Sequence, residues 1–279
     1  MSNPIADPLV ELPDTSPTAD MVRIEATEAG AATVVMNRPE RRNAFNADLI
    51  AAMAEAFETL RGAEGVRVVF LRGAGGTFSA GADLDWMRAA VDRTESDNRE
   101  DAYAMAHMLK ALWDLPQLTV ALIEGGAYGG GAGVAAACDL ALATADTKFS
   151  FSEVKLGLIP ATVSPYVVAA IGPRAARGLF ASGQVFDAQH ALRIGLIGEI
   201  APDAAALDAA RDRIAAEMVA CAPGAVADAK QLVGDVYGQE ITHHLMDETA
   251  KRIAAARVGT EGQEGVRAFL ERRKPIWAT

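Results

Sequence analysis

One stretch decides the fold of this chain: Gly125-Gly126-Ala127-Tyr128-Gly129-Gly130-Gly131-Ala132-Gly133. It closely follows the apolar run Val120–Ile123, which has the length and composition of a short buried strand. The glycines then lead into an alanine-rich apolar segment, which we interpret as a helix. A strand that passes through a glycine-rich loop into a helix is typical of an α/β fold with a mostly parallel sheet.

The segments before this stretch continue the alternation of strands and helices. Val22–Glu25 and Ala32–Met36 flank a turn and predict a β-hairpin. Asn46 can cap a helix over residues 47–60, where apolar side chains recur at helical spacing. The remaining elements predicted for this half are strands at Val68–Leu71 and Leu140–Ala143 and a helix at 100–114.

Beyond residue 161 the pattern changes, because only helical periodicity is left. The predicted helices cover residues 162–171, 174–182, 187–193, 204–220, 224–236, 241–257 and 261–273. We therefore expect an α/β domain followed by a helical C-terminal segment, which packs on the sheet or on a neighbouring subunit.

The composition of the chain excludes several classes of function. Of its 279 residues, 37 are acidic and 26 are basic, and the formal net charge is −11. Because nucleic-acid binding depends on Lys and Arg that neutralise phosphates, we expect no nucleic-acid partner. The apolar runs are interrupted before they reach the roughly 18 residues of a membrane span, so we expect no membrane partner.

Residues 1–20 contain four prolines and several acidic residues, so we expect a disordered leader there and not a signal peptide. The two cysteines, Cys138 and Cys221, lack the spacing of metal ligands. We expect both to be buried, reduced thiols, as in a cytoplasmic protein.

A second loop of small residues, Gly76-Thr77-Phe78-Ser79-Ala80-Gly81-Ala82-Asp83-Leu84, follows the strand that ends at Leu71. If a helix begins near Asp83, the N–H groups at its start are unpaired and can bind an anion or a developing oxyanion. The same holds for the glycines at 129–131. The alternative for both loops is a plain turn that lets helix and sheet pack closely. The Lys-Ser/Thr ending of a phosphate-binding P-loop is absent from the stretch at 125–133.

Glu153 closes the sequence Phe149-Ser150-Phe151-Ser152-Glu153. A carboxylate among apolar neighbours is costly unless it is paired, hydrogen-bonded or protonated, and burial moves its pKa toward neutrality. Such a group can act as a general acid or base. The alternative is a Glu that caps a helix or lies on the surface. The four histidines show neither the arrangement of a hydrolytic triad nor the spacing of a metal site, so we expect no metal.

Five ordered motifs connect these loops with the rest of the chain. They are Asn37-Arg38-Pro39 with Asn43-Ala44-Phe45, Phe78–Leu84, Tyr128–Gly131, Cys138-Asp139-Leu140 and Ser152–Pro160. With these motifs, from about Val22 to the C-terminus, the chain resembles the enoyl-CoA hydratase/isomerase (crotonase) family. Ala82–Met87, Pro160–Pro165 and Glu261–Arg273 look most similar to bacterial hydratases of 3-methylglutaconyl-CoA and related carboxylated enoyl-CoA thioesters.

The resemblance implies an α/β fold in three parts. After the leader at 1–20, residues 21–182 form a crotonase-like spiral of ββα units with mostly parallel sheets, which carries the acyl-CoA site. Residues 183–279 form a C-terminal α-helical segment used in trimerisation. The expected assembly is a homotrimer or a dimer of trimers.

The resemblance also implies roles for individual residues. The two backbone donors of an oxyanion hole fall on Ala82 and Gly130, and one catalytic glutamate falls on Glu153. The other glutamate of the family's hydratases falls on Gly133, which has no side chain. Further contacts are expected from the backbone of Ala80, Asp83 and Leu84 to the adenine, from Trp86 to the acyl group, and from Arg41, Arg42 and Lys274 (of a neighbouring subunit) to the CoA phosphates. Ordinary packing of Trp86 and solvation of the basic side chains are the alternatives.

The implied reaction is the addition of water across the α,β double bond of an enoyl-CoA. Because Gly133 leaves a single carboxylate, the first alternative is a Δ3–Δ2 enoyl-CoA isomerase that uses Glu153 as its only proton shuttle. The second alternative is a non-catalytic member of the family that only binds acyl-CoA. No metal or redox cofactor is expected, since coenzyme A is part of the substrate.

Overall fold

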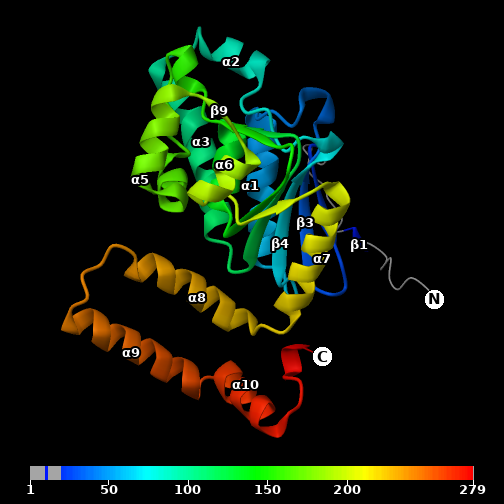
Figure 1. Ribbon diagram of the computed structural model, residues 1–279, viewed down its shortest axis with the longest axis vertical. Coiled ribbons are helices and arrows are strands. Elements are labelled where there is room, and N and C mark those ends of the chain that lie inside the picture. Colours follow the sequence, from blue (N-terminus) through cyan, green and yellow to red (C-terminus); the bar gives the residue numbers. More distant parts are fainter. Residues whose placement is uncertain (1–9, 12–19, 279) are drawn as a thin grey trace.

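The computed structural model describes residues 10–11 and 20–278 (Figure 1). The predicted leader at 1–20 therefore lies outside the described residues, except for Asp20 and the two-residue strand β1 (Val10–Glu11). The backbone of β1 pairs antiparallel with the next strand, β2. Within the described ranges, no helix is both long and apolar enough to cross a bilayer.

Seven strands of the described chain form the main sheet, in the order β1-β2-β3-β4-β5-β7-β10. The predicted hairpin is confirmed, because β2 and β3 pair antiparallel. From β3 onward each neighbouring pair is parallel, as the alternation of strands and helices predicts. The bounds are β2 (Val22–Ala26), β3 (Ala31–Met36), β4 (Val68–Gly73), β5 (Leu118–Ile123), β7 (Leu140–Thr144) and β10 (Glu199–Ala201).

A second sheet of three short strands was not predicted. Its strands are β6 (Gly126–Tyr128), β8 (Lys148–Ser150) and β9 (Val185–Asp187). The strand β6 lies inside the glycine-rich stretch that we interpreted as a loop, and it pairs parallel with β8. Pairing with a strand far along the chain makes β6 extended, and its own composition carries no strand signal.

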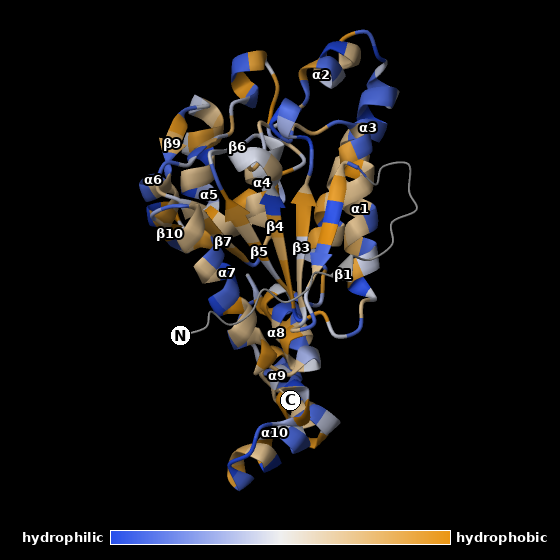
Figure 2. Ribbon diagram, turned by 90° about the vertical axis from the view of Figure 1, so that its right-hand side faces the viewer, coloured by the Kyte–Doolittle hydropathy of each residue, from blue (hydrophilic) through white to orange (hydrophobic). Residues whose placement is uncertain are grey.

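Helices cover both faces of the main sheet, and the central strand β4 is therefore buried on both faces. Val69 and Leu71 point into the larger core with α1 (Ala47–Arg61) and α3 (Glu95–Trp113). Val68 and Phe70 alternate with them and face α7 (Ala204–Val219). The apolar central strands are orange in Figure 2.

Several helix boundaries follow from local signals. Asn46 caps α1, since its side chain accepts a hydrogen bond of 2.9 Å from the N–H of Leu49, as predicted. The helix α3 begins earlier than the predicted residue 100, because Thr94 and Asp97 form a capping box. The remaining helices of this part are α2 (Leu84–Ala90), α4 (Gly130–Ala137), α5 (Ser164–Ser182), which is broken at Gly172 between the two predicted helices, and α6 (Ala188–Ile194).

The last three helices form an arm that extends away from the sheets (Figure 1). They are α8 (Pro223–Val236), α9 (His243–Val258) and α10 (Thr260–Glu271). The residues of α8 and α9 are all at least partly exposed, and large apolar side chains of the arm face solvent, including Tyr237, Ile241, Phe269 and Leu270. Such an arm leaves apolar surface uncovered within one protomer.

Candidate active site

The first donor loop is aligned by a short parallel pairing between Phe45 and Ala82. The N–H of Phe45 donates to the carbonyl of Gly81 at 2.7 Å, and the N–H of Asp83 donates to the carbonyl of Phe45 at 2.8 Å. Because a trans peptide is planar, the N–H of Ala82 points opposite to the Gly81 carbonyl and thus away from Phe45. No group among the described residues accepts this N–H, and Ala82 is exposed.

The second donor lies at the start of α4. Gly129 has φ 49° and ψ −116°, a backbone conformation that requires glycine. Its carbonyl accepts a hydrogen bond of 3.0 Å from the N–H of Gly133, so the N–H of Gly130 points out of the helix start. Within the described part of the chain, the N–H of Gly130 has no acceptor.

The two donor loops lie side by side. The N–H of Ser79 donates to the carbonyl of Gly126, and the N–H of Tyr128 donates to the carbonyl of Ser79, each at 3.0 Å. Gly81 sits so close that a Cβ there would lie 3.0 Å from the carbonyl oxygen of Tyr128. The loops are therefore one unit and not two independent turns.

Glu153 reaches this unit through the small second sheet. Tyr128 pairs with Ser150, and Glu153 follows at the start of a short 3-10 helix (Glu153–Leu156). A Cβ on Gly129 would lie 3.1 Å from Oε1 of Glu153, so the carboxylate rests on the backbone next to the Gly130 donor.

The carboxylate of Glu153 is partly buried and only partly hydrogen-bonded. Its Oε2 is buried and has no hydrogen-bond partner among the described residues. Burial raises the pKa of the Glu153 carboxyl. An unpaired buried oxygen of this kind needs either a proton or a donor from a ligand.

The position to which the family resemblance assigns a second carboxylate, Gly133, has no room for a side chain. A Cβ on Gly133 would lie 2.5 Å from Cβ of Val163 and still closer to its Cγ1. Val163 is 2% exposed, so it cannot simply turn away into solvent. The missing side chain at Gly133 thus leaves packed apolar core and not an empty space.

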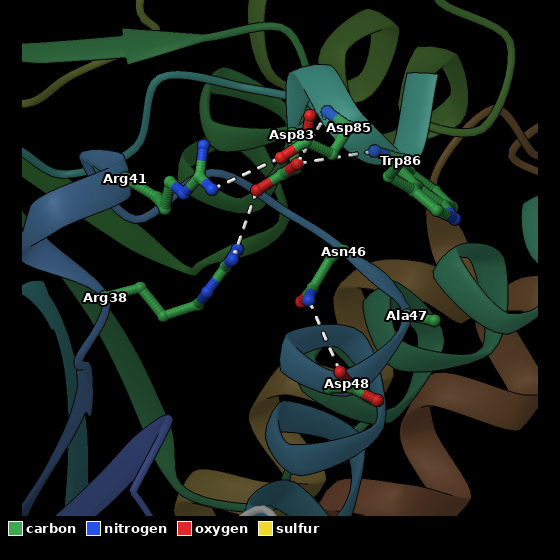
Figure 3. A pocket seen from close by; sticks show the side chains of 8 residues that line it. All are labelled: Arg38, Arg41, Asn46, Ala47, Asp48, Asp83, Asp85 and Trp86. Atoms are coloured by element: carbon green, nitrogen blue, oxygen red, sulfur yellow. Dashed lines mark hydrogen bonds and ion pairs between the residues drawn. The ribbon is translucent and has the colours of Figure 1, made fainter. Parts of the chain in front are cut away.

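A pocket of about 350 Å³ opens beside the first turn of α2 (Figure 3). Arg41 pairs there with Asp85 at 3.2 Å, and the indole N–H of Trp86 donates to Asp101 at 3.1 Å. Figure 3 shows Arg38 and Arg41 pointing toward the start of α2 from the opposite wall. The pocket is lined by Arg38, Arg41, Asn46, Ala47, Asp48, Asp83, Asp85 and Trp86.

The structure brings together most of the predicted contact residues. The N–H of Ala80 donates to the carbonyl of Arg42 at 2.9 Å, and Leu84 is 70% exposed at the start of α2. Lys274 is different, because it follows α10 on the arm, at the end of the molecule away from α2 (Figure 1). Within one protomer it does not reach this pocket.

Sequence reasoning missed the residues that support the first loop. The side-chain amide of Asn43 donates to the carbonyls of Ala74 and Thr77 at 2.9 and 2.7 Å. The hydroxyl of Ser79 donates to the carbonyl of Asn43 at 2.8 Å and accepts from Gly81. Asn43 and Ser79 both stand in the quoted motifs, but spacing along the chain does not show that they touch.

Cys138 is buried as predicted, but Cys221 is partly exposed, because it lies between α7 and the arm. Both thiols are free. Across residues 10–11 and 20–278, no group of three or more His, Cys, Asp or Glu side chains is arranged to hold a metal ion.

This arrangement defines a class of site: two backbone N–H donors without acceptors among the described residues and one carboxylate with a buried, unpaired oxygen, at the carboxyl ends of parallel strands of an α/β fold. Such a site can hold the oxygen of a thioester as it becomes an enolate and move a proton nearby.

Comparison with known proteins agrees with this class. The family model for enoyl-CoA hydratase/isomerase matches residues 26–279. A solved structure from Legionella pneumophila with the designation enoyl-CoA hydratase/isomerase (crotonase) has 41% sequence identity and a TM-score of 0.88, and the match covers 93% of this chain and 99% of that one. An enoyl-CoA hydratase structure from Shewanella pealeana has 36% identity and a TM-score of 0.89, with 94% and 100% covered.

A curated relative from Mycosarcoma maydis, the enoyl-CoA isomerase/hydratase fer4, is 32% identical over 258 residues, which is 89% of this chain and 92% of the relative. The chain belongs to the enoyl-CoA hydratase/isomerase family and has the crotonase fold. It is accordingly an enzyme of that family.

Proposed function

We propose that this enzyme adds water across the α,β double bond of an enoyl-CoA, with a 3-methylglutaconyl-CoA-like thioester as its substrate. The observation that carries the proposal is the unpartnered, buried Oε2 of Glu153 beside two free backbone N–H groups. A purely acyl-CoA-binding protein would have no use for such a carboxylate, which costs stability when it ionises.

The proposed mechanism uses the main chain to hold charge and Glu153 to move protons. The thioester oxygen accepts hydrogen bonds from the N–H groups of Ala82 and Gly130. Glu153 takes a proton from water while the hydroxyl adds to the β-carbon, and negative charge develops on the thioester oxygen. Glu153 then returns a proton to the α-carbon, so that the elements of one water molecule are added. Loss of one such donor typically costs about 3–4 kcal/mol of transition-state stabilisation.

The substrate is held by its coenzyme A part in this proposal. The backbone of Ala80, Asp83 and Leu84 contacts the adenine, and Trp86 borders the acyl group. Arg41 lines the pocket beside α2, and the exposed Arg42 follows it in the chain. Both would offer positive charge to the CoA phosphates in an otherwise acidic protein. The reaction needs neither a metal nor a redox cofactor.

A second candidate reaction is Δ3–Δ2 isomerisation of an enoyl-CoA, and one observation favours it. Val163 fills the space beside Gly133. Of the two carboxylates that the described residues place at the donor loops, Asp83 is paired with Arg38, which leaves Glu153 with an unpaired oxygen. Moving a proton between two carbons requires one base, whereas hydration with one carboxylate requires Glu153 to act twice. The isomerase/hydratase name of the relative from Mycosarcoma maydis is consistent with either reaction.

We further propose that residues 21–182 form the catalytic core and that residues 183–279 assemble a homotrimer or a dimer of trimers in the cytoplasm. The exposed apolar side chains of the arm support this assembly, since a neighbouring subunit would cover them. Lys274 would then reach the CoA phosphates of a neighbouring subunit.

A direct assay distinguishes these reactions. Purified enzyme is given crotonyl-CoA, 3-methylglutaconyl-CoA and a 3-enoyl-CoA, and the absorbance of the conjugated thioester is followed. Loss of absorbance with a conjugated substrate supports hydration, and a gain with the 3-enoyl-CoA supports isomerisation. No change with any of the three would contradict both and favour a non-catalytic role.

The variant Glu153→Gln tests the proposed base in the same assay. We expect a loss of roughly 100-fold or more. The matched control is Glu28→Gln, because Glu28 is exposed on the β2–β3 turn, and it should keep full activity. Full activity of Glu153→Gln would show that the assigned base is wrong for either reaction.

A further inference from the structure

Arg38 joins the two segments that align the first donor loop. Its guanidinium donates to the carbonyl of Ala44 at 2.5 Å and to Oδ2 of Asp83 at 3.1 Å. Ala44 directly precedes Phe45, and Asp83 directly follows Ala82. Arg38 therefore binds both segments of the pairing between Phe45 and Ala82, at the residue next to each. Figure 3 shows its guanidinium directed at Asp83.

Asp83 connects Arg38 to the backbone next to the Ala82 donor. Its Oδ1 accepts the N–H groups of Asp85 and Trp86 at 2.9 and 3.3 Å, which fixes the first turn of α2. Burial alone would raise the pKa of Asp83, but these backbone bonds and the ion pair with Arg38 outweigh it and hold the pKa below its ordinary value. The carboxylate is thus ionised, and Arg38 is the positive group that compensates its charge.

The ion pair is well shielded from solvent, since the side chains of Arg38 and Asp83 are 12% and 6% exposed. Removing one partner of such a pair leaves an uncompensated buried charge, which the surrounding backbone relieves by moving. The backbone next to Asp83 is the peptide of Ala82, and its direction is set by the pairing with Phe45. The N–H of Phe45 donates to the carbonyl of Gly81 at 2.7 Å, and the N–H of Asp83 donates to the carbonyl of Phe45 at 2.8 Å. A shift of Asp83 therefore disturbs this pairing and turns the Ala82 N–H. An oxyanion donor loses its effect when its direction changes, because hydrogen bonds weaken steeply with angle.

We propose that Arg38 is a positioning residue that aims the Ala82 N–H at the substrate carbonyl, through Asp83 on one side and Ala44 on the other. This inference rests on the proposed function, because it requires that the Ala82 N–H receives a thioester oxygen. Arg38 differs in this respect from Arg41, whose ion pair with Asp85 is half exposed and lies two residues further along the chain from Ala82.

The experiment measures how strongly the backbone donors hydrogen-bond to the carbonyl oxygen of a bound thioester. A 4-(dimethylamino)cinnamoyl-CoA thioester is bound to the enzyme, and its absorption maximum is recorded. The excited state of this chromophore carries extra negative charge on the carbonyl oxygen, so strong hydrogen bonds to that oxygen move the maximum to longer wavelength. The variants are Arg38→Met and Arg38→Lys, and kcat and KM are measured beside the spectrum.

For Arg38→Met we expect a smaller spectral shift on binding, a kcat that is lower by roughly 10- to 100-fold, and a KM within about 3-fold of wild type. Arg38→Lys should recover part of the shift, since one ammonium group can pair with Asp83 but cannot also grip Ala44 with the same geometry. Adding Asp83→Asn to Arg38→Met should cause little further loss of kcat, because the two residues act as one unit.

Arg61→Met is the matched control. Arg61 also joins a carboxylate, Glu58, to backbone carbonyls of another segment, those of Ala111 and Asp114, but it does so away from the donor loops. It should lower thermal stability without changing the shift or kcat.

Three outcomes would overturn the inference. If Arg38→Met lowers stability but keeps the wild-type shift and kcat, its role is structural only. A raised KM with unchanged kcat and shift would make Arg38 a coenzyme A contact instead. If the wild-type enzyme binds the chromophore with no shift at all, the proposed oxyanion hole fails and this inference fails with it. Should Arg38→Met not fold, an unchanged shift and kcat in Arg38→Lys would overturn the inference.

Discussion

Val163 occupies the space that any side chain at Gly133 would need. A Cβ at Gly133 would lie 2.5 Å from the Cβ of Val163, and Val163 is itself held in the core at 2% exposure. The absence of a second carboxylate is therefore built into the packing between α4 and the start of α5, and it cannot be reversed by one substitution.

Gly133→Glu alone should accordingly fail to improve hydration. We expect it to destabilise the fold by about 1–3 kcal/mol, because an overpacked core must shift neighbouring side chains or backbone. Denaturant unfolding monitored by circular dichroism measures this loss.

Gly133→Glu combined with Val163→Gly should be tolerated better and should hydrate crotonyl-CoA faster than Val163→Gly alone. Val163→Ala is the informative control, since it keeps the Cβ that already lies too close. If Gly133→Glu alone is as stable as wild type, the close packing described for this pair is wrong.

The raised pKa of Glu153 predicts how stability depends on pH. Burial favours the protonated carboxyl in the folded state, so the folded protein keeps this proton at pH values where the unfolded chain has lost it. The contribution is therefore most favourable below the ordinary Glu pKa, and stability falls as pH rises through the raised value. Glu153→Gln should unfold at higher denaturant concentration than wild type near pH 8, and the difference should vanish below about pH 4.

Activity should respond to pH in the opposite direction. If the ionised Glu153 takes the first proton, kcat rises with pH through the raised pKa, so the acidic limb lies above the range of an ordinary carboxyl group. An acidic limb at the ordinary Glu value would contradict the assignment of Glu153 as the base.

Gly129→Ala should damage the site more than the fold around it. The positive φ of 49° disfavours alanine, and a methyl group there would lie 3.1 Å from Oε1 of Glu153. We expect a stability loss of about 1–2 kcal/mol together with a fall in kcat, measured by unfolding and by the thioester assay. Gly178→Ala is the control, because a Cβ there meets nothing within 4 Å inside α5, and it should be neutral or slightly stabilising.

Phe269→Asp should reduce the mass of the assembly. Phe269 on α10 is 82% exposed in one protomer, and a charge there would be costly to bury against a neighbour. Light scattering after gel filtration measures the mass, and circular dichroism checks that the core stays folded. Val91→Asp, an equally exposed substitution beside α2, should keep the wild-type mass. An unchanged mass for Phe269→Asp would argue against assembly through α10.

The main sheet and most helices could be predicted from sequence because their signals are local. The apolar run at Val68–Leu71, the cap at Asn46 and the break at Gly172 each lie within the element that they define. The strand β6 could not be predicted in this way, since its extended backbone depends on pairing with β8, whose residues lie 22 positions later in the sequence. A three-residue strand rich in glycine carries no periodicity of its own.

The candidate site divides in the same way. The loops at Ala82 and Gly130 can be predicted from their small residues, and the family resemblance assigns a catalytic role to Glu153. The contact between Arg38 and Asp83 and the obstruction of Gly133 by Val163 join residues 45 and 30 positions apart, and no spacing rule connects such pairs. Only the three-dimensional structure brings these residues together.

The donor at Ala82 belongs to the main chain, and this has a consequence for how such an enzyme can diversify. Any residue except proline supplies an N–H there, so replacement of the exposed Ala82 side chain leaves the donor in place. In the proposed mechanism, side chains around the acyl group can then change by mutation while the backbone donor that holds charge is inherited intact. A scaffold of this kind separates the evolution of substrate choice from the maintenance of chemistry.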